Sequence, residues 1–248
     1  KPLKTCLAEA QPEAFIGVTR AQVARKLLGW APGVKLVTSG PRLGWGGLST
    51  GQLRKLGQRV SGPALADTQP DEMAALLFTS GSTGIPKGVV YRHRHFISQV
   101  EMLRSAFDIR PGEVDLPTFP PFALFDPAMG MTTVVPWMDP TRPAKADPAL
   151  LVQTIERFDV TNIFGSPALL NVLSRHTESK NIVLPSIRRV ISAGAAMPVA
   201  TIRRLQKSLS AGADIFTPYG ATECLPVASV SGSELDADVE RRTGAGEG

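Results

Sequence analysis

The sequence predicts an α/β fold of two packed βαβ-type subdomains with mainly parallel sheets flanked by helices. Short apolar runs of strand length alternate along the chain with helix-like segments, which is the pattern of βαβ units. Several of these runs end in loops of small residues, where open α/β sheets collect ligands. The 248 residues suffice for one large domain or two smaller ones. We expect the first subdomain to span residues 1–108 and the second 109–248.

In the first subdomain, helices and strands alternate until residue 40. Thr19 follows an apolar run and has the side chain of a good N-cap. Residues 40–70 are rich in Gly, Pro and Ser, so we expect a surface loop with one or two helical turns near 53–56. The expected strands are 14–18, 34–37 and 74–78, and the expected helices are 3–10, 19–28 and 92–107.

In the second subdomain, two helix starts are marked by a capping side chain followed by proline: Asp147-Pro148 and Ser166-Pro167. The loops 79–88, 192–198 and 217–223 each follow an expected strand, so we expect them on one side of their sheets. The expected strands are 114–119, 132–137, 160–164, 187–191 and 214–217, and the helices are 147–157, a segment from 166, and 199–209.

The loop Thr79–Gly88 is the strongest chemical signal. Its glycines let a backbone approach a ligand closely, its hydroxyls and N–H groups donate, and Lys87 adds a positive charge, so it can wrap a polyphosphate. It is not a Walker P-loop, because Lys87 precedes Gly88 rather than Ser or Thr. The alternative is a Gly/Ser-rich surface turn or linker.

Composition excludes several classes of function. Lys and Arg number 27 against 22 Asp and Glu, and this excess of +5 is spread in isolated doublets, which favours solvated faces over nucleic-acid binding. Cys6 and Cys224 form no CxxC pair and supply no zinc framework. No apolar run reaches the length of a membrane span. We therefore expect a cytoplasmic protein.

The ends of the chain suggest an internal piece of a longer protein. It starts at Lys1 in a helix-like segment and stops in the turn-like Gly244–Gly248. A disordered terminus is the alternative.

Taken together, Thr79–Gly88 and Tyr219-Gly220-Ala221-Thr222-Glu223 resemble two signatures of the adenylate-forming superfamily. This superfamily comprises acyl-CoA synthetases, peptide-synthetase adenylation domains and luciferases. The order and spacing of the two motifs suit it, and the resemblance covers essentially the whole chain. It implies the fold of the large N-terminal domain of these enzymes, with a phosphate loop at 79–88 and adenine-side loops at 192–198 and 217–223.

The resemblance implies that ATP is the nucleotide and Mg²⁺ the metal. Thr79 opens the phosphate loop, and the residues that would hold the β- and γ-phosphates are Ser80, Gly81, Ser82, Thr83, Gly84 and Lys87. Thr222 would bond the α-phosphate, and Glu223 would ligate Mg²⁺.

The resemblance also implies an adenine site and a histidine. Tyr219, followed by Gly220, would stack on adenine, with Gly194, Ala195 and Ala196 forming the opposite wall. His93 matches a histidine that follows threonine in the family, although Arg92 precedes it here. The catalytic set implied is therefore Lys87, His93, Thr222 and Glu223.

One branch of the superfamily resembles this chain further. Segments 119–131, 138–143 and 222–226 look like the branch that makes β-lactones in bacterial olefin biosynthesis, and Phe122-Ala123 stands where many members have an aromatic-His pair. There, a 2-alkyl-3-hydroxy fatty acid is adenylated, and its own hydroxyl expels AMP. The apolar segment 119–131 could face a pocket, a partner or only the core. This branch implies an acyl carboxylate substrate and partner enzymes of a lipid or olefin pathway.

Two alternatives stay open. A long-chain acyl-CoA or acyl-AMP ligase would share the core motifs, and a nucleotide-binding module could keep the fold without the chemistry. The family's ribose-binding aspartate and its C-terminal domain with a catalytic lysine are not in this chain. We expect the chain by itself to bind nucleotide weakly and to catalyse adenylation poorly or not at all.

Overall fold

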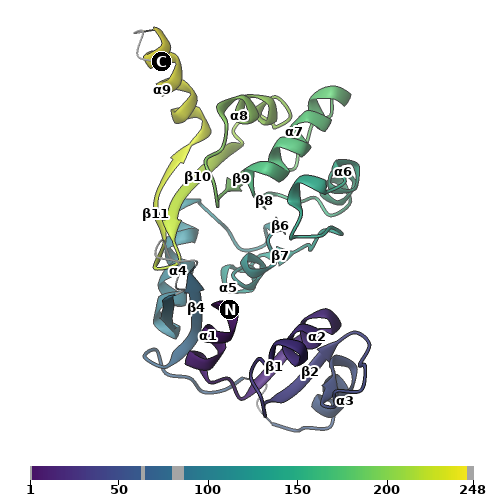
Figure 1. The fold of residues 1–248 in the computed structure, drawn as a ribbon. Helices are drawn as coiled ribbons and strands as arrows, with labels where there is room; N and C mark the ends of the chain where they lie inside the picture. The colour runs from purple at the N-terminus through teal and green to yellow at the C-terminus, as the bar shows by residue number, and fades with distance from the viewer. Residues whose placement is uncertain (1, 63–64, 80–86, 245–248) are drawn as a thin grey trace. The chain divides into compact units, whose positions relative to one another are not determined.

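The computed structural model describes residues 2–62, 65–79 and 87–244 and confirms the predicted α/β class with mainly parallel sheets (Figure 1). Contacts divide the chain into two compact units, Lys1–His95 and Phe96–Gly248. The division falls at the start of helix α4 (His93–Ala106), and α4 packs Val100 and Leu103 against the core of the second unit. The boundary that we expected at residue 108 lies at the other end of this helix.

The first unit contains a parallel sheet in the order β1-β2-β3. The buried Gln22 side chain on α2 holds this sheet, since its Nε2 donates to the carbonyl of Val37 at 3.1 Å. Thr19 is the first residue of α2 rather than its N-cap, and its hydroxyl donates to the carbonyl of Pro41. The elements are α1 (Pro2–Ala10), β1 (Ala14–Val18), α2 (Thr19–Leu28), β2 (Lys35–Ser39), β3 (Leu48–Ser49) and α3 (Thr50–Gly57).

The same unit contains an antiparallel hairpin that the sequence did not predict. Strand β4 (Met73–Thr79) pairs with β5 (Lys87–Arg92), and Thr79 lies opposite Lys87 at the end of the ladder. The expected passage from strand through loop to helix is therefore wrong, because a second strand precedes α4. Its residues Val89, Val90 and Tyr91 have high β-propensity, which was the signal for it.

The second unit is built on a six-stranded sheet in the order β11-β10-β9-β8-β6-β7, in which only β11 runs antiparallel to its neighbour. The strands are β6 (Val114–Pro117), β7 (Thr132–Thr133), β8 (Asn162–Gly165), β9 (Arg189–Ser192), β10 (Asp214–Ala221) and β11 (Cys224–Ser231). The helices after α4 are η1 (Pro120–Leu124), α5 (Asp126–Met129), η2 (Pro143–Lys145), α6 (Pro148–Arg157), α7 (Pro167–Lys180), α8 (Val199–Gln206) and α9 (Gly232–Gly244).

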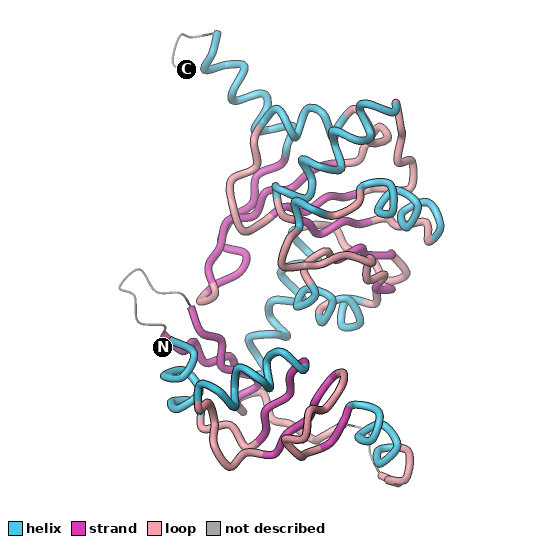
Figure 2. Tube along the Cα trace, turned by 45° about the vertical axis from the view of Figure 1, so that its right-hand side comes forward, coloured by secondary structure: helices cyan, strands magenta, loops and turns pink. Residues whose placement is uncertain are grey.

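Alternate side chains of the central strands enter two different cores. Ile163, Val190 and Ile215 pack with helices α6, α7 and α8 in the larger core. Phe164 and Ile191, each one residue further along, pack on the opposite face with α4 and α5. Figure 2 shows these strands with helices on both sides. The sheet is thus covered on both faces, as parallel sheets require.

Predicted helix starts and strand ends had mixed outcomes. The side chains of Asp147 and Ser166 cap α6 and α7 as predicted. The expected strand 132–137 stops at Thr133, shortly before Pro136, which lacks the N–H that a ladder needs. The expected loop 217–223 is mostly strand, because β10 continues to Ala221 and folds back into β11. Within the described residues, no helix is long and apolar enough to cross a membrane.

Candidate active site

The adenine-side candidates of the second unit lie on two neighbouring strands. Ile191 on β9 pairs with Phe216 on β10, and Gly194 and Tyr219 each follow that pair by three residues. Both therefore emerge at the same edge of the sheet. Tyr219 is 71% exposed, so its ring is available for stacking on a ligand. Ala195 and Ala196 are exposed in the loop after β9, which Gly194 enters with φ of 93°.

Thr222 and Glu223 form the two-residue turn between β10 and β11. Glu223 is exposed, with its carboxylate free to meet a ligand or a cation. Gly220 lies where the register shifts, and a Cβ there would lie 2.4 Å from Leu225 Cδ2 and 2.9 Å from the carbonyl oxygen of Cys224. Only glycine fits this close approach, so Gly220 shapes the turn that presents Thr222 and Glu223.

The phosphate-side candidates belong to the first unit. Thr79 ends β4, and Lys87 begins β5 opposite it with an exposed side chain. Ser80, Gly81, Ser82, Thr83 and Gly84 lie outside the described residues. His93 is half-buried at the start of α4, and its backbone N–H donates to the carbonyl of Glu72 at 3.2 Å. Thr79 and Lys87 are thus strand partners in the first unit. In the second unit, Gly194–Ala196 and Tyr219–Glu223 lie at the ends of two neighbouring strands.

A pocket in the second unit opens beside the adenine-side candidates. Its cavity volume is about 60 Å³, within a wider hollow of about 590 Å³ that includes space open to solvent. Ala193 and Pro218 line it, and they directly precede Gly194 and Tyr219 in the chain. Fifteen residues, mostly apolar, form its lining: Leu103, Phe107, Ile109, Asp115, Phe122, Phe125, Asp126, Met129, Asn162, Phe164, Ile191, Ala193, Pro218, Leu225 and Pro226.

The segment 119–131 contributes four side chains to this pocket, of which Asp126 is the polar one. Phe122 stacks on Phe164 with ring centroids 3.8 Å apart, and Phe125 and Met129 come from the adjoining turns. Leu124, by contrast, is 80% exposed, and Met131 is buried in the core beneath. Of the three roles considered for this segment, lining a pocket is therefore established for part of it.

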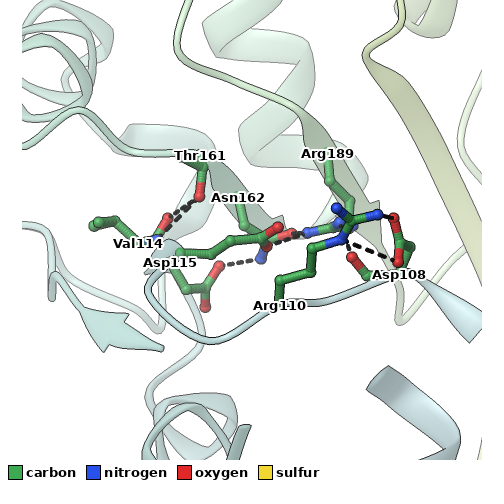
Figure 3. Close-up of polar contacts among 8 residues, drawn as sticks. Asp108, Arg110, Val114, Asp115, Thr161, Asn162 and Arg189 are labelled. Carbon is green, nitrogen blue, oxygen red and sulfur yellow. Dashed lines mark hydrogen bonds and ion pairs between the residues drawn. The ribbon is translucent and has the colours of Figure 1, made fainter. Parts of the chain in front are cut away.

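A row of buried polar side chains crosses three neighbouring strands (Figure 3), and its members Asp115 and Asn162 also line the pocket. Asp115 pairs with Asn162 on the next strand, and Asn162 pairs with Arg189 on the strand after that. The Asn162 amide donates to Asp115, and Arg189 Nη1 forms an ion pair with Glu113 at 2.6 Å. Arg189 Nη2 also donates to the carbonyl of Asp108 at 2.8 Å. The row thus compensates its own buried charges.

The carboxyl groups of Asp115 in this row and of Asp126 on α5 favour a shared proton. Burial raises the pKa of Asp115 well above its ordinary value, and the charge of Asp126 raises it further. Burial also raises the pKa of Asp126, against hydrogen bonds from Thr133 and Asp115 that lower it. Asp115 is therefore the protonated partner, which donates to Asp126. The sequence analysis missed these residues, although an aspartate inside apolar stretches such as 114–117 was a signal.

The match to a family model covers residues 1–246 and is described as AMP-binding enzyme. The chain belongs to this family, which confirms the resemblance to adenylate-forming enzymes. It is 58% identical over 237 residues to an olefin beta-lactone synthetase of Stenotrophomonas maltophilia and 56% identical over 238 residues to one of Xanthomonas campestris. These matches cover 95% and 96% of the chain but 42% of each relative, so the chain spans about two fifths of their length.

Solved structures confirm the fold. The N-terminal domain of FACL13 from Mycobacterium tuberculosis matches 89% of the chain and 54% of its own length, with a TM-score of 0.69 and 22% identity. A luciferase-like enzyme from the mealworm Zophobas morio matches 96% of the chain and 55% of its own length, with a TM-score of 0.71 and 18% identity. At these identities the likeness concerns the fold alone.

Proposed function

We propose that the protein containing this chain adenylates a 2-alkyl-3-hydroxy fatty acid with ATP and closes the acyl-AMP into a β-lactone. The observation that carries the proposal is the apolar pocket whose edge residues Ala193 and Pro218 adjoin Gly194 and Tyr219. An acyl chain in this pocket would have its carboxylate beside the adenine-side loops. The identity to two olefin beta-lactone synthetases favours the 3-hydroxy acid as substrate.

The nucleotide would be held by the residues of the two sequence motifs and of the loop after β9. In this assignment, Thr79 opens the phosphate loop, and Ser80, Gly81, Ser82, Thr83, Gly84 and Lys87 bind the β- and γ-phosphates. Tyr219, followed by Gly220, stacks on one side of adenine, and Gly194, Ala195 and Ala196 form the other wall. Thr222 donates to the α-phosphate. His93, at the start of α4, lies close to the phosphate loop in the chain and is assigned to the substrate side of the same reaction.

The residues present fit a magnesium ion that is bound mainly by the nucleotide. Within the described ranges, no group of three or more His, Cys, Asp or Glu side chains could hold a metal by itself. Mg²⁺ typically takes one or two carboxylates and completes its shell with phosphates and water, so the exposed Glu223 would suffice. When bound, the ion supplies positive charge that stabilises the leaving pyrophosphate.

The chemistry requires positioning more than acid or base groups. A carboxylate oxygen of the substrate attacks the α-phosphorus and pyrophosphate leaves. The substrate's 3-hydroxyl then attacks the acyl carbon, loses its proton and expels AMP as the four-membered ring closes. Lys87 and the Thr222 hydroxyl stabilise negative charge on phosphate oxygens. The Phe122, Phe125 and Phe164 rings keep water from the acyl-AMP, which would otherwise be hydrolysed.

A ligase that transfers the acyl group to coenzyme A is the second candidate. It is favoured by a 32% identity over 178 residues to a 4-chlorobenzoate–CoA ligase of Arthrobacter, which covers 68% of this chain and 33% of that enzyme. We also infer partner enzymes of a lipid or olefin pathway from the two synthetases. The free Cys6 and Cys224 are consistent with a reducing, cytoplasmic location.

Pyrophosphate exchange by the full-length protein tests the proposal. Long-chain 2-alkyl-3-hydroxy acids should drive incorporation of labelled pyrophosphate into ATP, and the product should be a β-lactone whether or not coenzyme A is added. The absence of carboxylate-dependent exchange would refute adenylation. An acyl-CoA product that forms only with coenzyme A would favour the second candidate.

A further inference from the structure

Polar side chains line the apolar pocket at the strand level farthest from Ala193 and the adenine-side loop. Asp115 on β6, Asn162 on β8 and Asp126 on α5 all line the pocket, and each is at most 3% exposed. We call these three residues the polar floor. They lie among apolar lining residues, so they define a chemically distinct end of the cavity.

Strand register gives the depth of the pocket. Asp115 and Asn162 are level with Arg189, the first residue of β9. Ala193, four residues after Arg189, lines the pocket beside the adenine-side loop. With a rise of about 3.3 Å per residue, the floor lies roughly 13 Å from the level of Ala193. An extended alkyl chain advances about 1.3 Å per carbon, so about ten carbons fill this distance.

The floor is held by its own hydrogen bonds. Asn162 donates to Asp115, Asp115 is hydrogen-bonded to Asp126, and the Thr133 hydroxyl donates to Asp126 at 2.7 Å. Arg189 Nη1 donates to the side-chain oxygen Oδ1 of Asn162 at 3.5 Å and forms an ion pair with Glu113. An alkyl chain can contact these groups, but pushing past them would leave buried donors and acceptors unpaired. An alkyl chain longer than the pocket therefore cannot displace these side chains without a large loss of binding free energy.

We propose that the polar floor of Asp115, Asp126 and Asn162 sets the maximum length of the acyl branch that this pocket accepts. The inference rests on the proposed function, because it takes the pocket as the acyl site. It makes the three residues determinants of substrate length, with no role at the reacting atoms.

Equilibrium binding of a graded series of straight-chain carboxylic acids to the full-length protein, measured by calorimetry, tests the inference. Each added methylene should tighten binding about threefold to fourfold until the chain reaches the floor. A further methylene should weaken binding at least about tenfold. We call the longest acid before this loss the length ceiling, and we expect it between about eight and twelve carbons. Because binding is measured without turnover, the result is independent of whether the protein forms a β-lactone.

Substitutions in the pocket test whether the polar floor sets the longest acid that binds. Replacing both carboxyls, Asp115→Ala with Asp126→Ala, should move the ceiling to longer acids by at least one methylene. The near-isosteric Asp126→Asn should keep it. Ile191→Ala, which widens the wall midway along the pocket, should change affinities and leave the ceiling in place.

Three outcomes would overturn the inference: a wild-type series without a ceiling, no binding of any acid, or an unchanged ceiling in a folded double variant. The first two need no variant, so a failure of the double variant to fold still leaves the inference open to refutation. Failure of the proposed function would appear separately, as absence of pyrophosphate exchange.

Discussion

Replacing Arg189 with methionine should destabilise the second unit strongly. The Arg189 side chain is 7% exposed and the Glu113 side chain 5%, so their ion pair at 2.6 Å is buried. The substitution keeps the apolar stem but leaves a buried carboxylate without its cation, and it removes the donor to the Asp108 carbonyl. Breaking a buried pair in this way costs about 3 to 5 kcal/mol.

Native-state hydrogen exchange measures this loss locally, without assuming that a multidomain protein unfolds in one step. Amides of β8 and β9 should lose protection by a factor between roughly 10² and 4 × 10³. The matched control is Arg110→Met, which breaks an exposed pair with Asp108 and should change protection little. Replacing Glu113 with leucine as well should restore much of the loss, because it removes the uncompensated charge. A change of less than tenfold in Arg189→Met would refute this account of the buried row.

Three further predictions test other parts of the site. Because the pKa of Asp115 is raised, the native state binds a proton that the unfolded state releases, so the free energy of unfolding should fall as pH rises above about 3.8. In urea unfolding measured over a range of pH, Asp115→Asn should make this fall in the free energy of unfolding smaller. The exposed Asp139→Asn should leave it unchanged. If the free energy of unfolding depends on pH equally in wild type and Asp115→Asn, Asp115 is not the protonated group. Lys87→Ala and Glu223→Gln should each slow pyrophosphate exchange roughly 10²-fold, whereas Lys55→Ala on α3 should not, and unchanged rates would remove both residues from the site. Gly220→Ala should lower exchange while leaving the thermal midpoint of unfolding close to wild type, because its Cβ displaces the Thr222-Glu223 turn; the helical Gly51→Ala is the control, and full activity in Gly220→Ala would show that the turn tolerates the shift.

The sequence predicted the fold class because its alternation of apolar strands and capped helices is strong. Asp147 and Ser166 identified two helix starts correctly, since a capping side chain before proline acts locally. The sequence did not predict the antiparallel pairs β4–β5 and β10–β11. The residues between their strands have the composition of ligand-binding loops, which does not indicate strand pairing. Tertiary pairing, not local propensity, extends β10 to Ala221.

Part of the candidate site could likewise be predicted from the sequence, and part could not. Motif residues such as Tyr219, Gly220, Thr222 and Glu223 could be named from the sequence because they are contiguous and turn-forming. The polar floor could not, since Asp115, Asp126 and Asn162 come from separate elements and meet only through strand register and the packing of α5. Likewise, no local pattern shows that Leu225 and Pro226 line the same pocket as Leu103. Their roles depend on three-dimensional proximity.

The proposed adenylation and ring closure are tested most directly by following the substrate's two carboxylate oxygens into the products. A 2-alkyl-3-hydroxy acid with both carboxylate oxygens labelled with ¹⁸O would be turned over by the full-length protein with ATP and without coenzyme A. Adenylation followed by ring closure predicts one label in AMP, one in the lactone carbonyl and an unlabelled ring oxygen from the 3-hydroxyl. Release of ADP, AMP without label, or label in the ring oxygen would contradict the proposed reaction.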